Sequence, residues 1–211
     1  GTFGKEAFHF IDFLHASGQT YWQILPLGPT GFGNSPYQTF STFAINPLFI
    51  DPEKLYEDGL LDKEDCFVFS IKSSSQLVEY ERVYKNHFIL LKKAYERFKK
   101  IEPSKFLKFI SENEYWLSDY AKFMAIKTYF GNISSQDWPN NILQRDKESL
   151  ENLLNKLSDE ITFFKFLQFK AYTQWKEIKV YAESQNIKII GDLPIYTGLD
   201  SSDIWSNPKI F

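Results

Sequence analysis

Cysteine is almost absent from this sequence. Cys66 is the sole cysteine among 211 residues, so no disulfide can form within the chain, and a reducing compartment is favoured. No apolar run approaches the roughly 20 residues that span a bilayer, and no secretory signal pattern stands at the start. We therefore expect a cytoplasmic protein without membrane contact. The first residue, Gly1, predicts a start that is processed, trimmed or internal to a longer gene product.

An excess of positive charge is also lacking. The net charge is −3 and the isoelectric point about 5.7, which argues against nucleic acid as a partner. The three histidines are scattered over predicted helices without the spacing of metal ligands: His9, His15 and His87. The glycine-rich stretch at 28–33 has no following Lys-Ser/Thr and no helix, so it is no phosphate loop. No serine lies in a nucleophile elbow. We expect neither a metal nor an organic cofactor.

Apolar and aromatic residues are plentiful. Hydrophobic residues make up 43% of the chain, and 21 Phe, 12 Tyr and 5 Trp are present. This content is enough for a real core, in one domain or one domain with a small subdomain. Most of the aromatic side chains belong in that core, while a minority on loops would suit flat ligands such as sugar rings.

One stretch organises the rest of the sequence. Residues 21–27 form a short apolar run with sharp stops on both sides, which predicts a buried strand. Residues 28–38 follow with several glycines and prolines, which predict a rigid, irregular loop. A buried strand that ends in such a loop is how an α/β enzyme presents a binding site. The alternative is a purely structural turn.

The chain on either side of this stretch is expected to be largely helical. Residues 3–17 predict an amphipathic helix, with Thr2 as N-cap and Gly18 after its end. The remaining expectations, in order, are an extended segment or edge strand at 43–50, a short helix from Asp51-Pro52 to Gly59, a linker at 73–75, helices up to 186 with a loop at 132–146, and a second buried strand at 187–196. Three of these helices are expected from their apolar spacing or their ends: one with the stripe Val83, His87, Leu91, Ala94 and Phe98, one with the stripe Leu117, Tyr120, Met124 and Thr128 closed by Gly131, and one that starts near Asp146.

The order helix, strand, helical stretch, strand predicts an α/β fold in which two barrel strands are separated by an insertion. Residues 1–50 would be the first barrel segment, with helix, strand and substrate loop. Residues 51–186 would be a mainly helical inserted subdomain, and residues 187–211 the next barrel strand and its loop.

Several long motifs resemble those of the amylomaltase, or 4-α-glucanotransferase, family. Residues 18–31 read GQTYWQILPLGPTG, and residues 33–47 read GNSPYQTFSTFAINP. Residues 191–196 and 200–211 are similar to the family pattern G-D-x-P-I-[YF] followed by D-S-[AS]-D-V-W-x-N-P-x-x-F, and residues 116–121, 166–169 and 174–175 match the family as well. In the second motif Thr39 stands where the family usually has serine. The likeness covers nearly the whole chain in order.

The resemblance implies part of a (β/α)₈ TIM barrel of the α-amylase kind with a large helical insertion, and a retaining mechanism. Such chemistry needs two carboxyl groups about 5–5.5 Å apart. In the family the nucleophilic aspartate lies in an Arg-x-Asp motif, and no Arg-x-Asp occurs in this sequence. We therefore expect the catalytic groups beyond Phe211 and assign none of them to Asp192, Asp200 or Asp203.

Substrate binding is what the resemblance carries onto this chain. Tyr37 resembles the family tyrosine that stacks beside the glucose at the cleavage point. Ser35 and Gln38 flank it and would hydrogen-bond sugar hydroxyls, or else stabilise the turn. Asp192 lies at the carboxyl end of a barrel-like strand and would bind substrate, or else hold its loop. Trp205 would either form the floor of a sugar site or anchor its own loop, and we favour the anchoring role.

The function implied is transfer of α-1,4-glucan segments from a donor glucan to glucose or a maltooligosaccharide acceptor. The chain by itself is expected to be inactive, since it lacks the carboxyl pair. Two alternatives stay open. One is a non-catalytic glucan-binding fragment, and the other is an α-amylase-type hydrolase.

Overall fold

The computed structural model describes residues 1–31, 34–69, 79–101 and 104–210, and the chain divides into two compact units. Unit 1 comprises Gly1–Trp22, Pro47–Ser104 and Lys170–Ile190, and unit 2 comprises Gln23–Asn46, Lys105–Phe169 and Gly191–Phe211. Each unit is therefore assembled from three separate stretches of sequence. The predicted division into a barrel part and an insertion, with boundaries at 50 and 186, stays a prediction. The two units are defined by how compactly their residues contact one another, which does not distinguish a barrel from an insertion.

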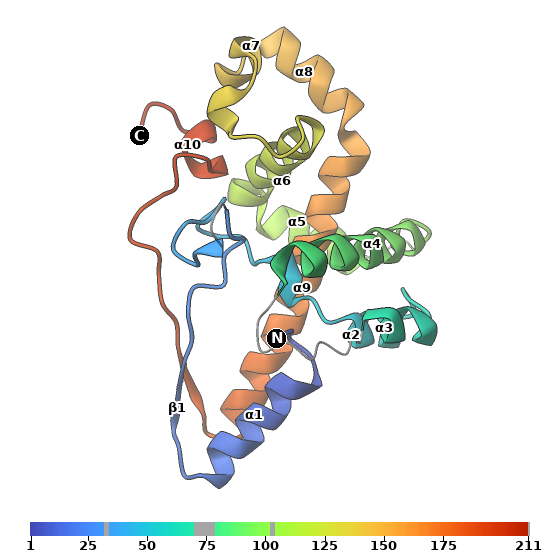
Figure 1. Ribbon diagram of the computed structural model, residues 1–211, viewed down its shortest axis with the longest axis vertical. Helices are drawn as coiled ribbons and strands as arrows, with labels where there is room; N and C mark the ends of the chain where they lie inside the picture. The colour runs from blue at the N-terminus through green and yellow to red at the C-terminus, as the bar shows by residue number, and fades with distance from the viewer. Residues whose placement is uncertain (32–33, 70–78, 102–103, 211) are drawn as a thin grey trace. The chain divides into compact units, whose positions relative to one another are not determined.

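Helices dominate the described residues. Figure 1 shows the elements in chain order: α1 (Lys5–Ala16), β1 (Tyr21–Gln23), η2 (Pro47–Phe49), α2 (Pro52–Glu57), α3 (Lys63–Phe69), α4 (Tyr80–Phe98), α5 (Ser104–Glu112), α6 (Glu114–Tyr129), η3 (Ser135–Asp137), α7 (Asn140–Leu143), α8 (Lys147–Lys156), α9 (Ser158–Ser184), β2 (Lys188–Ile190) and α10 (Ser202–Ser206).

In unit 1 the first predicted helix is confirmed. Gly18, with φ of +70°, follows its last turn as expected. The expected cap at Thr2 is wrong, because the Thr2 hydroxyl donates instead to Asp51 Oδ2 at 2.5 Å. Gly4 holds the N-cap position, and a Cβ there would come within 2.0 Å of the Asp51 carboxylate. The close approach of that carboxylate requires glycine at this position.

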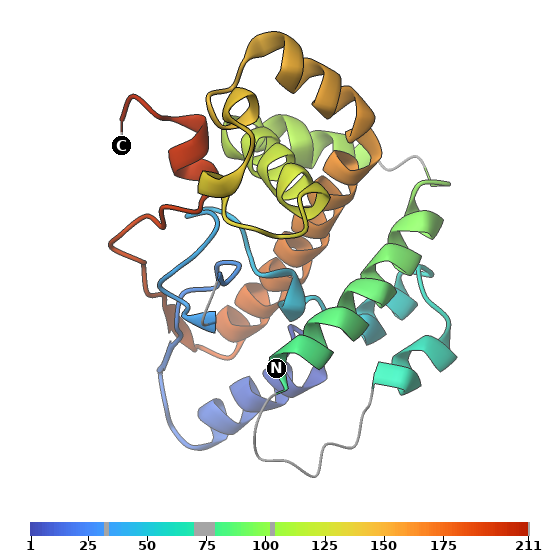
Figure 2. The same cartoon turned by 45° about the horizontal axis from the view of Figure 1, so that its top comes forward.

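Helix α1 packs against the carboxyl-terminal half of α9, as both Figure 1 and Figure 2 show. The rings of Phe8 and Tyr181 lie 5.1 Å apart, and the Tyr181 hydroxyl donates to Asp12 Oδ1 at 2.5 Å. At the other end of the pair, His15 Nδ1 donates to the carbonyl oxygen of Gln185 at 2.9 Å. The amphipathic helix predicted from the sequence therefore packs against another helix, α9.

The sheet is smaller and more open than the sequence predicts. Strands β1 and β2 pair in a two-stranded sheet, and each is three residues long. The expected buried strands at 21–27 and 187–196 are wrong in length and burial: Leu25 is 60% exposed and Ile195 89% exposed. An apolar strand is buried only where other layers cover it. The described residues thus form a mainly helical fold with one small sheet, and the complete barrel stays a prediction.

The short segment that leads into α2 combines one correct and one wrong prediction. Asp51 caps α2 by accepting from Glu53 N at 2.9 Å and Lys54 N at 3.2 Å, and Pro52 opens the helix as expected. Gly59, with φ of +73°, ends it. The prediction of an extended segment or edge strand at 43–50 is wrong for its second half, which forms η2; this turn begins at Pro47, which has no N–H donor for a strand ladder.

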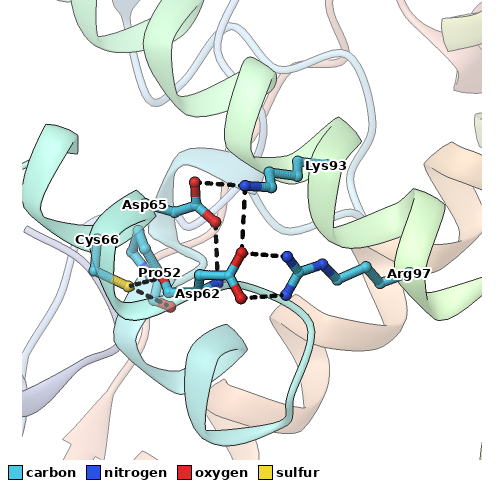
Figure 3. Close-up of polar contacts among 6 residues, drawn as sticks. All are labelled: Pro52, Asp62, Asp65, Cys66, Lys93 and Arg97. Atoms are coloured by element: carbon cyan, nitrogen blue, oxygen red, sulfur yellow. Dashed lines mark hydrogen bonds and ion pairs between the residues drawn. The ribbon is translucent and has the colours of Figure 1, made fainter.

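Helix α4 buries the face that its spacing predicts. Of the predicted stripe, His87, Leu91, Ala94 and Phe98 are buried, and Val83, in the first turn, is half-buried. Helix α3 lies beside α4 (Figure 2), and charged side chains join the two around Asp62, Asp65, Lys93 and Arg97 (Figure 3). The predicted linker at 73–75 lies outside the described residues.

Unit 2 has its core between α6 and the first half of α9. The predicted α6 stripe is confirmed at Leu117, Tyr120 and Met124, whereas Thr128 is exposed because it lies in the last turn before Gly131. The predicted loop at 132–146 is interrupted by η3 and α7. Asp146 accepts from Ser149 N at 3.0 Å and so starts α8 where expected.

Candidate functional site

The loop that carries Tyr37 is closed by backbone pairing within unit 2. An isolated antiparallel bridge joins Thr30 and Thr39. Gly31 N donates to Gln38 O at 3.0 Å, and Phe40 N donates to Pro29 O at 3.1 Å. Phe32 and Gly33, the latter the first residue of the second family-like motif, lie outside the described residues. The two ends of the loop, Thr30 and Thr39, are therefore held side by side.

The base of this loop is tightly packed around Thr39, the residue that differs from the usual family serine. Its hydroxyl lies within hydrogen-bond distance of two carbonyl oxygens, Pro29 O at 3.0 Å and Ser41 O at 2.8 Å. A Cβ on Gly28 would lie 2.4 Å from the Thr39 Oγ1 atom. Gly28 is thus required by a close approach, and the Thr39 hydroxyl makes contacts that use only the hydroxyl group, which serine also has.

Two of the predicted site residues meet directly. The Tyr37 hydroxyl donates to Asp192 Oδ2 at 2.8 Å, although the two residues are 155 positions apart. The hydrogen bond to the Asp192 carboxylate, together with desolvation and the negative charge nearby, raises the pKa of Tyr37 above its ordinary value. Tyr37 remains 46% exposed and Asp192 is half-buried, so this pair is open to a ligand.

Ser35 and Gln38 take the turn-stabilising roles that were their alternative. Ser35 Oγ accepts from Tyr37 N at 3.3 Å, which is a local serine turn. Gln38 closes the loop through its backbone, since its N–H donates to Ser35 O at 3.1 Å, and its side chain is exposed. Both lie beside Tyr37, and their contact with a sugar stays a prediction.

Trp205 has the anchoring arrangement that the sequence favoured. Its indole is 4% exposed, and its Nε1 donates to Ile142 O at 3.3 Å. The Arg145 guanidinium lies 4.5 Å from the ring centroid, and the rings of Phe123 and Trp138 pack nearby at 6.1 and 5.9 Å. Trp205 therefore fixes α10 within unit 2, and its role in substrate binding stays a prediction.

Helix α10 in turn holds the end of the Tyr37 loop. Ser202 donates to the Phe40 carbonyl oxygen from both N, at 2.8 Å, and Oγ, at 3.1 Å. Asp203 Oδ2 accepts from Thr42 N at 2.9 Å. Desolvation raises the pKa of the Asp203 carboxyl above its ordinary value, while the hydrogen bonds from Thr42 oppose that rise. The Asp203 carboxylate thus holds the backbone at the end of the loop by accepting a hydrogen bond from Thr42 N.

Sequence reasoning missed two buried polar residues that shape the site unit. Gln168, which is fully buried, pairs with both backbone groups of Ile45 at 2.9 Å each, as a neighbouring strand would. Lys127 is buried in α6 and donates to Asp200 Oδ2 at 2.5 Å. The sequence does contain a signal for both residues, because each is a polar residue on an otherwise apolar helix face. Since buried polar groups require partners, such a residue indicates a hydrogen-bonding role inside the fold.

Metal binding and membrane insertion are two other possibilities for the chain. Among residues 1–31, 34–69, 79–101 and 104–210, no group of three or more His, Cys, Asp or Glu side chains is arranged to hold a metal ion. Over the same ranges, no helix has both the length and the apolar character that a membrane span needs.

The comparisons with known proteins agree on one family. The family profile described as 4-alpha-glucanotransferase, glycoside hydrolase family 77, matches residues 1–211. The 4-alpha-glucanotransferase of Clostridium butyricum is 46% identical over 211 residues, which are 100% of this chain and 43% of the relative. That of Streptococcus pneumoniae serotype 4 is 42% identical over 213 residues, covering 100% of this chain and 42% of the relative.

A solved structure gives the same result. The amylomaltase from Streptococcus agalactiae in complex with acarbose is similar with a TM-score of 0.95 and 41% identity, covering 100% of this chain and 43% of that chain. The present chain thus spans less than half the length of these relatives. With the profile matched from its first to its last residue, the chain belongs to the 4-α-glucanotransferase family, glycoside hydrolase family 77.

Proposed function

We propose that the protein containing this chain is a 4-α-glucanotransferase that moves α-1,4-glucan segments to glucose or another glucan. The observation that carries the proposal is the 2.8 Å hydrogen bond between Tyr37 and Asp192. These residues come from two separate family-like motifs and make one tyrosine–carboxylate pair. The solved relative with acarbose supports a glucan-like ligand for this family.

The pair suits a sugar in a definite way. The exposed phenol ring of Tyr37 offers an apolar face for stacking on a pyranose. Because its O–H donates to Asp192, its oxygen can accept from a sugar hydroxyl. A carboxylate has about four acceptor positions, so Asp192 can bind sugar hydroxyls in addition to Tyr37. Ser35 and Gln38 would contribute at the edge of the same site.

The proposed mechanism is a retaining double displacement, which needs two carboxyl groups about 5–5.5 Å apart. We assign neither group to this chain. Asp200 is engaged by Lys127 and Asp203 by Thr42, and Asp192 is the partner of Tyr37. Both catalytic carboxyls would belong to the part of the family sequence that this chain does not span, as would the remaining strands of the barrel.

In the same proposal, β1 and β2 are neighbouring strands of a (β/α)₈ barrel, and residues 51–186 are the helical insertion between them. The pairing of two strands so distant in sequence supports this arrangement. In this arrangement Asp192 closely follows β2 and Tyr37 lies in the long loop after β1, and barrel enzymes bind their substrates at the loops that follow their strands.

Incubation of the intact protein with maltotriose tests the proposal. Transfer produces glucose and longer maltooligosaccharides while the number of reducing ends stays constant. A rising number of reducing ends would instead indicate a hydrolase, and a protein that binds acarbose without any turnover would be a glucan-binding module. The separate chain of residues 1–211 is expected to produce neither glucose nor longer products.

A further inference from the structure

Lys127 is an unusual residue because its charged side chain is only 4% exposed. A buried ammonium is costly unless several partners replace its water. Its Nζ donates to Asp200 Oδ2 at 2.5 Å and to Ile133 O at 2.9 Å. It also lies 4.8 Å from the centroid of the Phe40 ring, within the range of a cation–π interaction. The ammonium is thus surrounded by partners of three kinds.

These partners come from all three chain segments of unit 2. Lys127 belongs to Lys105–Phe169, Phe40 to Gln23–Asn46 and Asp200 to Gly191–Phe211. The second carboxylate oxygen of Asp200 accepts from Ser135 N at 2.9 Å, so Asp200 is fixed on both sides. The Lys127 ammonium therefore joins the three segments of unit 2, two of which carry Tyr37 and Asp192.

Two of the residues that Lys127 contacts lie close in sequence to the members of the Tyr37–Asp192 pair. Phe40 follows Tyr37 by three residues, directly after the loop closes at Thr39, and Asp200 follows Asp192 by eight residues. The Tyr37 hydroxyl reaches Asp192 only if these two segments keep their spacing. The ammonium contacts the Phe40 ring and the Asp200 carboxylate at once, and so holds that spacing.

We propose that Lys127 is a positioning residue that sets the distance between Tyr37 and Asp192 before a glucan binds. It acts through Phe40 and Asp200 and does not touch the substrate itself. The part of this inference that concerns glucan binding rests on the proposed function, whereas the geometry of the tyrosine–carboxylate pair does not.

Lys170 provides a matched control within the same chain. It lies in unit 1 with its side chain 10% exposed, pairs with Asp58 Oδ2 at 2.8 Å and lies 5.7 Å from the Phe98 ring centroid. Like Lys127, it pairs with a carboxylate and lies near an aromatic ring, but in the unit that holds neither Tyr37 nor Asp192. If both lysines served stability alone, replacing either one would have the same effect on glucan binding and on the Tyr37–Asp192 hydrogen bond.

The first experiment compares Lys127→Met and Lys170→Met in the intact protein. Both variants should lower the melting temperature. We expect Lys127→Met to raise the Kd for acarbose, measured by calorimetry, and the KM for maltotriose by about tenfold, with a smaller change in kcat, because a misplaced binding group weakens the bound complex. Lys170→Met should leave both constants within about twofold of wild type. Equal changes in the two variants would overturn the proposal.

The second experiment needs no glucan. Tyrosines labelled with ¹³C at Cζ report their hydrogen bonds by NMR at pH 7, with Tyr37→Phe to assign the resonance and Asp192→Asn to define the shift on losing the charged acceptor. Lys127→Met should move the Tyr37 resonance by at least half of that shift, and Lys170→Met should not. An unmoved resonance in folded Lys127→Met rejects the inference. If the wild type neither binds acarbose nor turns over maltotriose, the proposed function fails and this measurement alone decides on Lys127.

Phe40→Leu extends the test in case Lys127→Met does not fold. It removes the aromatic face beside the ammonium and keeps the ion pair with Asp200. The Tyr37 resonance should move in the same direction by a smaller amount, and the Kd for acarbose should rise by about twofold to threefold. No movement in Phe40→Leu would contradict the proposed route through Phe40.

Discussion

The two units of the chain use buried polar side chains for different purposes. All five predicted site residues lie in unit 2, and none lies in unit 1. In unit 1, Gln174 pairs with the backbone of Asp51, the residue that caps α2. In unit 2, Gln168 makes the same pair with Ile45, which belongs to an irregular segment. The comparison indicates that unit 1 reinforces a regular element, whereas unit 2 gives fixed positions to chain without regular structure.

The largest expected effect comes from removing these glutamines. Gln168→Leu leaves a buried N–H and a buried C=O of Ile45 without partners, which should cost about 2–5 kcal/mol of unfolding free energy. For a chain of this size that is a fall of about 5–15 °C in melting temperature. Gln174→Leu should cost about as much, while only Gln168→Leu weakens acarbose binding. Calorimetry with and without acarbose separates the two, and equal affinities would remove the distinction between the units.

In unit 1, the buried imidazole of His87 should make the stability depend on pH. Burial lowers the pKa of His87 from 6.5 to about 4, against smaller opposing contributions from the Pro47 and Ile50 backbone and the Asp51 charge. The unfolded chain then binds a proton that the folded chain does not, so stability is complete above pH 6.5 and falls as the pH decreases toward 4. The loss should be roughly 3 kcal/mol.

Urea unfolding at pH 7.5 and pH 5 measures the His87 effect. His87→Gln should reduce the difference in unfolding free energy between the two pH values, because glutamine does not titrate. A pH dependence identical to that of the wild type would show that other groups are responsible.

The two tyrosine–carboxylate pairs offer a smaller and more direct comparison. Tyr37 donates to Asp192 in unit 2, and Tyr181 donates to Asp12 in unit 1; the pKa of each tyrosine is raised chiefly by that hydrogen bond. In the intact protein, Tyr37→Phe should lower kcat/KM for maltotriose by about threefold to tenfold, and Tyr181→Phe should leave it unchanged. Steady-state kinetics distinguish them. If Tyr37→Phe keeps full kcat/KM, its hydroxyl has no place in the site.

The smallest effect is expected at the charged cluster between α3 and α4 (Figure 3). Arg97 makes two hydrogen bonds to the carboxylate of Asp62, and Lys93 pairs with Asp65 at 2.7 Å. These side chains are exposed enough for water and salt to screen them. Arg97→Met should change the melting temperature by no more than about 2 °C, well below the effect of Lys127→Met. A larger drop, abolished by 1 M salt, would place the cluster among the major stabilising contacts.

Helix ends were the most predictable part of the fold. Gly18, Gly59 and Gly131 all adopt positive φ after a helix, as their positions in the pattern predict, and Asp146 caps α8 as expected. Such signals are local, because a cap or a left-handed residue is determined by its immediate neighbours. Local chemistry therefore located these helix ends to within a few residues.

Strands and buried polar contacts were not predictable in the same way. The apolar run at 24–27 suggests burial, but burial depends on other segments covering it, and Leu25 is 60% exposed. Lys127 and Gln168 read as ordinary helix residues, because their partners Asp200 and Ile45 lie 73 and 123 positions away. Likewise the motifs indicated Tyr37 and Asp192 separately, and only the fold brings them together.

The pairing of α1 with the end of α9 has a consequence for biosynthesis. Asp12 and His15 meet partners that are 169 and 170 residues further along the chain. At about 5–20 residues per second, a ribosome needs on the order of 10–30 s to add that length. During this interval the nascent helix would expose Ile11 and Leu14, which are buried in the finished fold, to solvent. Protection of this short amphipathic segment by a chaperone during translation would thus have to last until α9 emerges.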